Sequence, residues 1–254
     1  MSDLAVSLIA FVAIAGATFL GFLLQRLLPK EHLSDASKDT VKVGMGMVAT
    51  LAALVLGLLV GFATTSFNDL RADVQHTSAN LVLLDRAMAQ YGPETKDIRE
   101  LLRRSTVARI RAFWPEGRFE PNERGPDEAL ALAEQVQVGL RALTPRTDAQ
   151  RWLQARALTL TSDLAETRWL LTAQAENNVP ELLLIVLIFW LAILFVSFAL
   201  FAPRNATVLV TLLVCALSLS GSIFIMLELN SPFSGAISIS SAPMRDALAR
   251  LGRP

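Results

Sequence analysis

The sequence predicts an all-α integral membrane protein with four transmembrane helices and a helical bundle inserted between the second and the third. Four apolar stretches, at residues 4–24, 43–67, 182–202 and 206–227, each reach the ~20 residues that a helix needs to cross a bilayer. None of them contains Asp, Glu, Lys, Arg or His. Most of the charge lies between the second and third stretches, where apolar residues recur at a helical period.

The composition agrees with a membrane protein and excludes several other classes. With 53% hydrophobic and only 18% charged residues, the chain is too apolar for an ordinary soluble domain. The 23 basic residues balance the 23 acidic ones, so no nucleic-acid partner is expected. The single cysteine, Cys215, lies in the fourth stretch and is interpreted as a small packing residue rather than a redox group.

The first stretch is interpreted as a retained transmembrane helix rather than a cleaved signal peptide. Its leader contains no basic residue, and its apolar run is longer than a signal core; Pro29 stops the helix. In the loop at residues 26–42, Ser34 or Asp35 is predicted to cap a short interfacial helix. His32 in this loop is interpreted as a solvated side chain, with a pH-sensing or ligand role as the alternative.

The third and fourth stretches form an antiparallel hairpin, because only a tight connection that contains Arg204 joins them. The chain therefore divides into four predicted segments. These are two membrane helices with their loop at 1–67, an extramembrane helical bundle at 68–179, the membrane hairpin at 180–229 and a tail at 230–254.

The second transmembrane helix is predicted to continue beyond the bilayer as an amphipathic helix. After residue 67 the apolar positions recur at spacings of three and four, with Thr77 as the polar exception. These apolar positions are Leu70, Val74, Leu81, Leu84 and Met88. The helix is predicted to end at the turn formed by Tyr91, Gly92 and Pro93.

Three further helices are predicted in the middle segment, at residues 94–114, 127–143 and 147–177, with a loop at 116–126. The last of them, the fourth helix of the middle segment, has Trp152 and Trp169 among its apolar positions and leads directly into the third span. Because the helices leave and re-enter the bilayer at one face, they form an antiparallel bundle or a set of stalks that prolong the membrane helices.

Small residues form a stripe along the second span and are the candidate functional residues. They recur at spacings of three and four, which places them on one helix face, and one pair forms a GxxxG motif. The stripe consists of Gly46, Thr50, Ala53, Gly57, Gly61 and Thr64. Such a face packs closely against another helix or lines a narrow path.

A second stripe, with hydroxyl groups, follows the fourth span. It consists of Thr207, Thr211, Cys215, Ser218 and Ser222. Either stripe is consistent with helix packing, in which the hydroxyls bond to their own helix, or with the lining of a pore.

The sequence offers little for catalysis, and no enzyme activity, cofactor or metal site is expected. Only two histidines are present, His32 and His76, and no phosphate-binding loop, metal-spaced cluster or nucleophile elbow appears. No ionisable residue lies at membrane depth between the interfacial Lys42, Glu181 and Glu228, which argues against a proton-coupled transporter.

Arginines gather on the predicted helix at residues 94–114, and they allow two interpretations. A solvated face that complements the helix dipole is favoured over a patch that attracts anions or lipids. The basic residues concerned are Lys96, Arg99, Arg103, Arg104, Arg109 and Arg111.

Three motifs resemble the bacterial bestrophin-like membrane protein family. They are the loop and second span at residues 32–63, the Phe-Trp-Pro turn at 113–115, and the tail at 228–235 with residues 240–243 beyond it. The resemblance covers nearly the whole chain. It implies a likeness to bestrophins, which are oligomeric anion channels with a pore lined by the second membrane helix and its extension. This chain departs from them in its second span, where aromatic residues are confined to Phe62 and Phe67.

Two functions follow as hypotheses. The first is a homo-oligomeric channel for inorganic ions, most simply anions, with the second span lining the path. The second is a non-conducting membrane anchor or sensor whose helical bundle binds a partner. The lipid bilayer and further copies of the chain are the expected partners in the first case.

The localisation expected from the resemblance is the bacterial inner membrane, with the bundle in the cytoplasm. The distribution of basic residues favours the opposite orientation, because five lie in the short loops and three lie near the membrane on the bundle side. This bias is small, so the cytoplasmic bundle is preferred.

Overall fold

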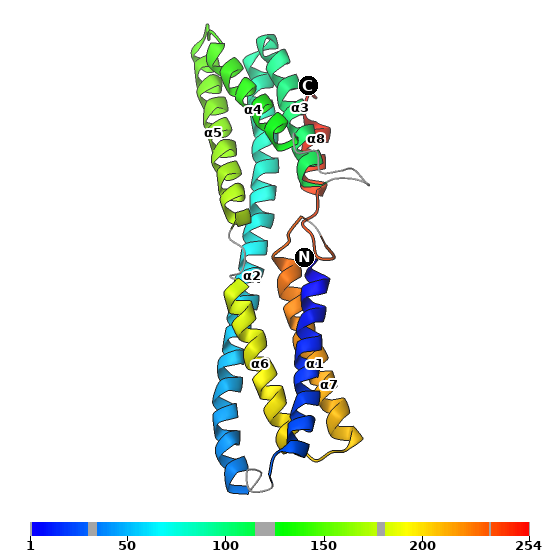
Figure 1. Cartoon of the computed structure of the whole chain (residues 1–254). Helices are drawn as coiled ribbons and strands as arrows, with labels where there is room; N and C mark the ends of the chain where they lie inside the picture. Colours follow the sequence, from blue (N-terminus) through cyan, green and yellow to red (C-terminus); the bar gives the residue numbers. More distant parts are fainter. Residues whose placement is uncertain (1, 30–34, 115–124, 177–180, 234, 254) are drawn as a thin grey trace. The chain divides into compact units, whose positions relative to one another are not determined.

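The computed structural model of the chain describes residues 2–29, 35–114, 125–176, 181–233 and 235–253, and in these ranges its regular elements are helices (Figure 1). Four helices are long and apolar enough to cross a membrane: α1, α2, α6 and α7. In chain order the helices are α1 (Asp3–Leu27), α2 (Asp35–Tyr91), α3 (Lys96–Phe113), α4 (Gly125–Ala142), α5 (Asp148–Glu176), α6 (Glu181–Phe201), α7 (Ala206–Leu229) and α8 (Ala242–Arg250).

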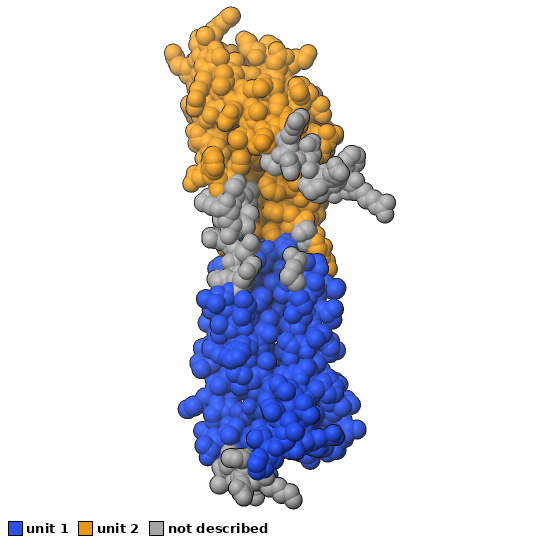
Figure 2. Space-filling model, viewed as in Figure 1, with its two compact units in different colours: residues 1–67, 178–231 blue, residues 68–177, 232–254 orange. Residues whose placement is uncertain are grey.

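The chain divides into two compact units, which Figure 2 distinguishes by colour. Unit 1 contains residues 1–67 and 178–231, and unit 2 contains residues 68–177 and 232–254. Helix α2 contributes residues to both units. The tail beyond residue 231 belongs to unit 2. In the prediction from sequence, the tail is a separate segment.

Unit 1 is built around α1, which packs against α6 and α7. Helices α1 and α6 come close together at Gly21, where a Cβ atom would collide with the backbone carbonyl oxygen of Val196 and the side chain of Ala199. Glycine is therefore required there for the two helices to cross. The buried core also takes side chains from α2. Its members include Ala10, Ile14, Ala17, Met45, Ala52, Leu59, Ala63, Leu187, Leu191, Phe195, Ala216, Ile223 and Met226.

Polar contacts fix one end of unit 1. The Gln25 amide donates to the Ala202 carbonyl at 3.1 Å, and its oxygen accepts from Arg204 Nε at 2.6 Å. Asn205 then caps α7, because its side-chain oxygen accepts from the Val208 amide at 2.8 Å. The short α6–α7 connection predicted from the sequence is therefore a hydrogen-bonded turn docked on the end of α1.

Unit 2 packs the second part of α2 against α3, α4 and α5. The five apolar positions predicted after residue 67 are all buried, as is Thr77. The buried apolar residues of α3, α4 and α5 include Ile98, Leu102, Val136, Leu140, Leu160 and Leu164. Apart from any gain in packing, burial of each such large side chain is worth about 1.5–3 kcal/mol.

The turn between α2 and α3 lies where the sequence predicts it. Gly92 has a φ of 139°, a conformation that is open only to glycine, and a 3₁₀ turn at Pro93–Thr95 follows it. The buried Thr95 hydroxyl bonds to the Met88 carbonyl at 2.6 Å and lies 2.9 Å from that of Gly92. This contact holds the start of α3 against the end of α2.

Two expectations need correction, one about the start of α2 and one about two tryptophans of α5. The residues from Asp35 to Lys42 are the first turns of α2 rather than a separate interfacial helix, because their helical period continues into the span without a break. Trp152 and Trp169, which were counted with the apolar positions of the fourth middle helix, are exposed.

The tail also contains a helix, α8, that the sequence interpretation missed. Its signals are a proline in the first turn, buried Met244 and Ala247 three residues apart, and Arg250 in the last turn. His32, Ser34, most of the loop predicted at 116–126 and the junction at 177–180 lie outside the described residues.

Candidate functional site

The small-residue stripe of α2 faces away from the rest of its own chain. All six predicted residues are exposed. The four buried residues of the same membrane span, Met45, Ala52, Leu59 and Ala63, lie on another face of α2. A Cβ atom added at Gly46, Gly57 or Gly61 would meet no atom within 4 Å. Packing within the subunit therefore does not explain why these positions are small.

The hydroxyls of this stripe bond to their own helix. Thr50 donates to the Gly46 carbonyl and Thr64 to the Val60 carbonyl, both at 2.8 Å. Their oxygens keep lone pairs on the exposed face, and the neighbouring glycines leave the helix backbone uncovered. The face is thus narrow in profile, weakly polar and uncharged.

Helix α2 has a third face, which is large and apolar. Its exposed residues are Val43, Met47, Leu51, Leu54, Leu58 and Phe62. At 3.6 residues per turn, these residues lie about a quarter-turn around the helix from the small stripe. The buried face lies in the opposite direction from the stripe. A surface of this kind is suited to lipid or to a neighbouring subunit.

The spacing of the small stripe continues beyond Thr64 along α2. The residues at this continued spacing are Asn68, Arg71, Gln75, Ala79, Val82 and Arg86. All of them are exposed except Val82, which is half-buried. This continuation carries two arginines and no carboxylate, whereas the acidic residues Asp69 and Asp73 lie on other faces of the helix.

The hydroxyl stripe on α7 is also directed outward. Thr207, Thr211, Cys215 and Ser218 are exposed, and Ser222 is half-buried. The hydroxyls of Thr211, Ser218 and Ser222 donate to carbonyls one turn earlier, at 2.9–3.1 Å. Because Cys215 is exposed, packing among the described residues of unit 1 does not explain why this position is small.

Glu228, expected to be interfacial, is buried in the last turn of α7. In the described part of the chain, no group of three or more His, Cys, Asp or Glu side chains is arranged to hold a metal ion. These residues thus supply no metal centre to the stripe.

The basic residues of α3 do not form a single surface. Arg99 pairs with the buried Asp85, and Arg103 pairs with Glu100 on the exposed side of the helix. Arg104 and Arg111 are exposed, while Arg109 lines a cavity inside unit 2. Only some of these basic residues therefore lie on a solvated face of α3.

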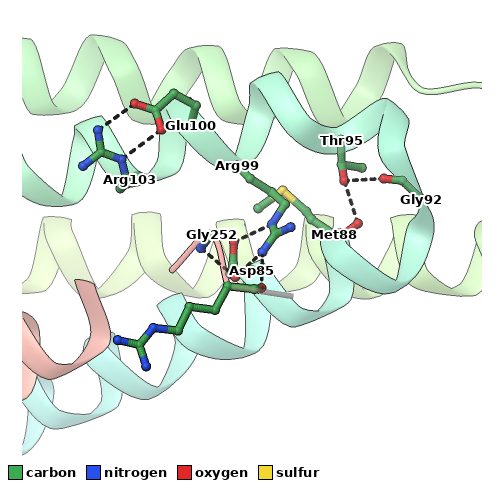
Figure 3. Close-up of polar contacts among 9 residues, drawn as sticks. Asp85, Met88, Gly92, Thr95, Arg99, Glu100, Arg103 and Gly252 are labelled. Carbon is green, nitrogen blue, oxygen red and sulfur yellow. Dashed lines mark hydrogen bonds and ion pairs between the residues drawn. The ribbon is translucent and has the colours of Figure 1, made fainter. Parts of the chain in front are cut away.

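The Asp85 carboxylate joins three segments of unit 2. Its oxygens accept from Nε of Arg99 at 2.8 Å and from Nη2 at 2.9 Å, and one of them also accepts from the Gly252 amide at 3.2 Å. Figure 3 shows this carboxylate facing Arg99 and the chain at Gly252. The hydrogen bond with Asp85 raises the pKa of Arg99, and Arg99 also donates to the Arg253 carbonyl. The ion pair thereby fastens the end of the chain to α2 and α3.

Two of the motifs behind the family resemblance meet in unit 2. The Phe113 ring lies 5.0 Å from the ring of Phe233, and the Trp114 ring lies 5.3 Å from it, edge to face. Trp114 Nε1 also donates to the buried Ile239 carbonyl at 2.7 Å. The end of α3 and the tail are therefore one packed cluster, which the sequence interpretation had described as separate motifs. Pro115 and Ser234 lie outside the described residues.

Two solved structures with a similar fold are from a bacterium. A crystal structure of a bacterial bestrophin homologue from Klebsiella pneumoniae with a point substitution has a TM-score of 0.67 at 14% identity, over 96% of both chains. Another crystal structure of such a homologue from this organism has a TM-score of 0.65 at 12% identity, over 96% of both chains. These similarities show the fold. No curated protein matches the sequence.

The sequence itself matches a family model described as the bestrophin-like domain, over residues 12–244. The match includes most of α1, all of α2, α6 and α7, and most of unit 2. It confirms the resemblance inferred from the three motifs. The chain belongs to the bestrophin-like family.

Proposed function

We propose that this protein is a homo-oligomeric channel for small inorganic anions, in which the small-residue face of α2 lines the path. The observation that carries the proposal is the exposure of all six stripe residues, with open space in front of the three glycines. When copies surround a central axis, a helix with a core face, a bulky face and a narrow face can direct the narrow one inward. Family membership supports this arrangement.

Charge on α2 favours anions over cations. The continued face carries Arg71 and Arg86 without a carboxylate, and a ring of copies would repeat these charges around the path. The uncharged stripe itself adds no barrier of buried charge. In this proposal unit 2 is the extramembrane bundle, it lies in the cytoplasm, and the protein occupies the bacterial inner membrane.

Halide flux into liposomes that contain the purified protein tests the proposal. We expect flux with the wild-type protein and loss of flux with Gly57→Leu, because leucine would project into the path and its Cβ would meet no atom of the described chain within 4 Å. Gly16→Leu is the matched control, since Gly16 is also exposed on a membrane helix and has the same open space around it. Flux that survives Gly57→Leu would place any path elsewhere.

Selectivity provides a second readout of the same proposal. Arg71→Glu should lower the permeability of chloride relative to sodium, because it reverses a charge on the continued face. Arg146→Glu makes the same charge change at an exposed position outside α2 and should leave the ratio unchanged. Equal effects of the two variants would contradict a path along α2.

A non-conducting anchor or sensor is the competing function, and one observation favours it. Unit 2 exposes Trp152 and Trp169 on α5, and exposed tryptophans are typical of protein interfaces. Absence of flux in folded, oligomeric wild-type protein, together with a stoichiometric partner lost in Trp152→Ala, would support this function and reject the channel.

A further inference from the structure

A cavity inside unit 2 contains two arginine side chains. Its volume is about 60 Å³, and α2, α3, α4 and α5 all contribute to its wall. The polar lining includes Arg109, Glu134, Gln137 and Arg168, and the α2 side is closed by Leu81 and Leu84. Both arginines are half-buried, and arginines withdrawn from water are normally paired with a carboxylate, so this arrangement needs an explanation.

Arg109 has no such carboxylate in the described part of the chain, where no ion pair or hydrogen bond engages its guanidinium. Burial and the nearby charge of Arg168 lower its pKa to about 10, which leaves it cationic at neutral pH. The only acidic residue in the lining, Glu134, is exposed and acts on Arg168. Among the residues that the structure describes, the cationic donor of α3 therefore faces the cavity without a counter-charge.

The other lining groups restrict what the cavity can hold. The hydroxyls of Ser105, Thr106 and Thr161 already donate to the backbone carbonyls of Ala129, Leu102 and Leu158. The donors that remain are the guanidinium of Arg109 and the amide of Gln137. The two arginines and one glutamate sum to a charge of about +1 at neutral pH, which one monovalent anion would neutralise. Since a water needs roughly 10–15 Å³ of such space, the volume admits a small ion but no organic ligand of appreciable size.

We propose that this cavity is a binding site for a small monovalent inorganic anion, such as a halide or nitrate, held by Arg109 and Gln137 and flanked by Arg168. The site lies within the helices of unit 2 and is separate from the stripe of α2. Its occupancy couples anion concentration to the stability of unit 2, because the anion supplies a counter-charge that the described residues do not give to a half-buried cation.

Thermal unfolding of the purified full-length protein at constant ionic strength tests this site, with chloride or nitrate replacing gluconate. We expect a saturable rise in the melting temperature, of about 3–6 °C at ten times the dissociation constant. Arg109→Met should abolish the rise and should not lower the melting temperature in gluconate, since it removes a half-buried cation that no described carboxylate pairs with. Arg104→Met, on the exposed face of α3, should retain the rise and thereby controls for general salt effects.

A structure determined in bromide gives the direct readout. Anomalous scattering from bromide beside Arg109 would support the site, and bromide absent from the cavity at saturating concentration would overturn it. An anion-dependent rise that persists in Arg109→Met would also overturn it. The two proposals fail separately. Wild-type protein that conducts but shows no anion-dependent rise would reject the site alone, and wild-type protein with a normal rise but no flux would reject the channel alone.

Discussion

At the scale of single residues, unit 2 depends on a few polar groups whose partners are distant in sequence. Asp85 is almost fully buried, with a side-chain exposure of 2%, and its partner Arg99 is 18% exposed. The bidentate geometry and the extra bond from Gly252 satisfy the carboxylate, which offsets the cost of removing it from water. In contrast, the Glu100–Arg103 pair one turn away is exposed on both sides.

Asp85→Asn should therefore destabilise the protein by about 3 kcal/mol, because it leaves the Arg99 guanidinium without its counter-charge in a largely buried setting. Glu100→Gln is the control and should scarcely change the melting temperature, since exposed ion pairs are screened by solvent. The measurement is thermal unfolding followed by circular dichroism in detergent. Equal melting temperatures for the two variants would show that the Asp85–Arg99 pair has no special weight.

At the scale of elements, an aromatic cluster and a hydrogen bond from Trp114 join the part of the tail before α8 to the end of α3. The Ile239 carbonyl accepts from Trp114, while the Ile239 amide donates to the Pro232 carbonyl at 2.8 Å. Ile239 is buried, so both of its backbone groups are satisfied within the cluster. The segment that precedes α8 is thus ordered without forming a helix or a strand.

Trp114→Phe keeps an aromatic ring but removes the donor to Ile239, leaving a buried carbonyl unsatisfied at a cost of about 1–3 kcal/mol. We expect faster amide hydrogen exchange in residues 232–251 than in the wild-type protein. Trp169→Phe is the matched control, because Trp169 is exposed on α5 and its replacement should leave that exchange unchanged. Unchanged exchange in Trp114→Phe would mean that ring packing holds this part of the tail without the hydrogen bond to Ile239.

Much of the element list could be predicted from sequence because hydrophobic period and length are local signals. Leu70 to Met88 illustrate this: their spacing predicted a continuous amphipathic helix, and they are buried along α2. The contacts between distant segments could not be predicted in this way. Trp114 with Ile239, and Asp85 with Arg99 and Gly252, depend on chain paths that no local period encodes.

The candidate site was likewise only partly predictable from local sequence patterns. Helical spacing placed the six small residues on one face, but only the packed unit shows that this face is exposed while Ala52 and Leu59 form the core. Arg109 was grouped with solvated arginines because its position in sequence resembles theirs. Its place in the cavity results from packing among four helices, which a single-helix pattern cannot reveal.

At the scale of the whole molecule, unit 1 leaves much of its membrane surface uncovered. In the most apolar windows of α2 and α7, only 17% of the residues are buried, against 39% in α1 and 33% in α6. The uncovered helices are the ones that carry the two small-residue stripes. A bulky exposed face can be satisfied by lipid, but an exposed face of glycine and threonine gains little there. This contrast favours further copies of the chain around the stripe of α2.

Cysteine cross-linking tests that assembly directly. In a Cys215→Ser background, Gly61→Cys places a thiol on the stripe, where we expect oxidation to join neighbouring subunits because their α2 helices approach one another near the axis. Val12→Cys places a thiol on an exposed face of α1 and should cross-link much less, since that face is proposed to meet lipid. Dimers would be counted on a non-reducing gel from membranes. Equal cross-linking at both positions would indicate random collision, and cross-linking only at residue 12 would place α1 rather than α2 at the subunit interface.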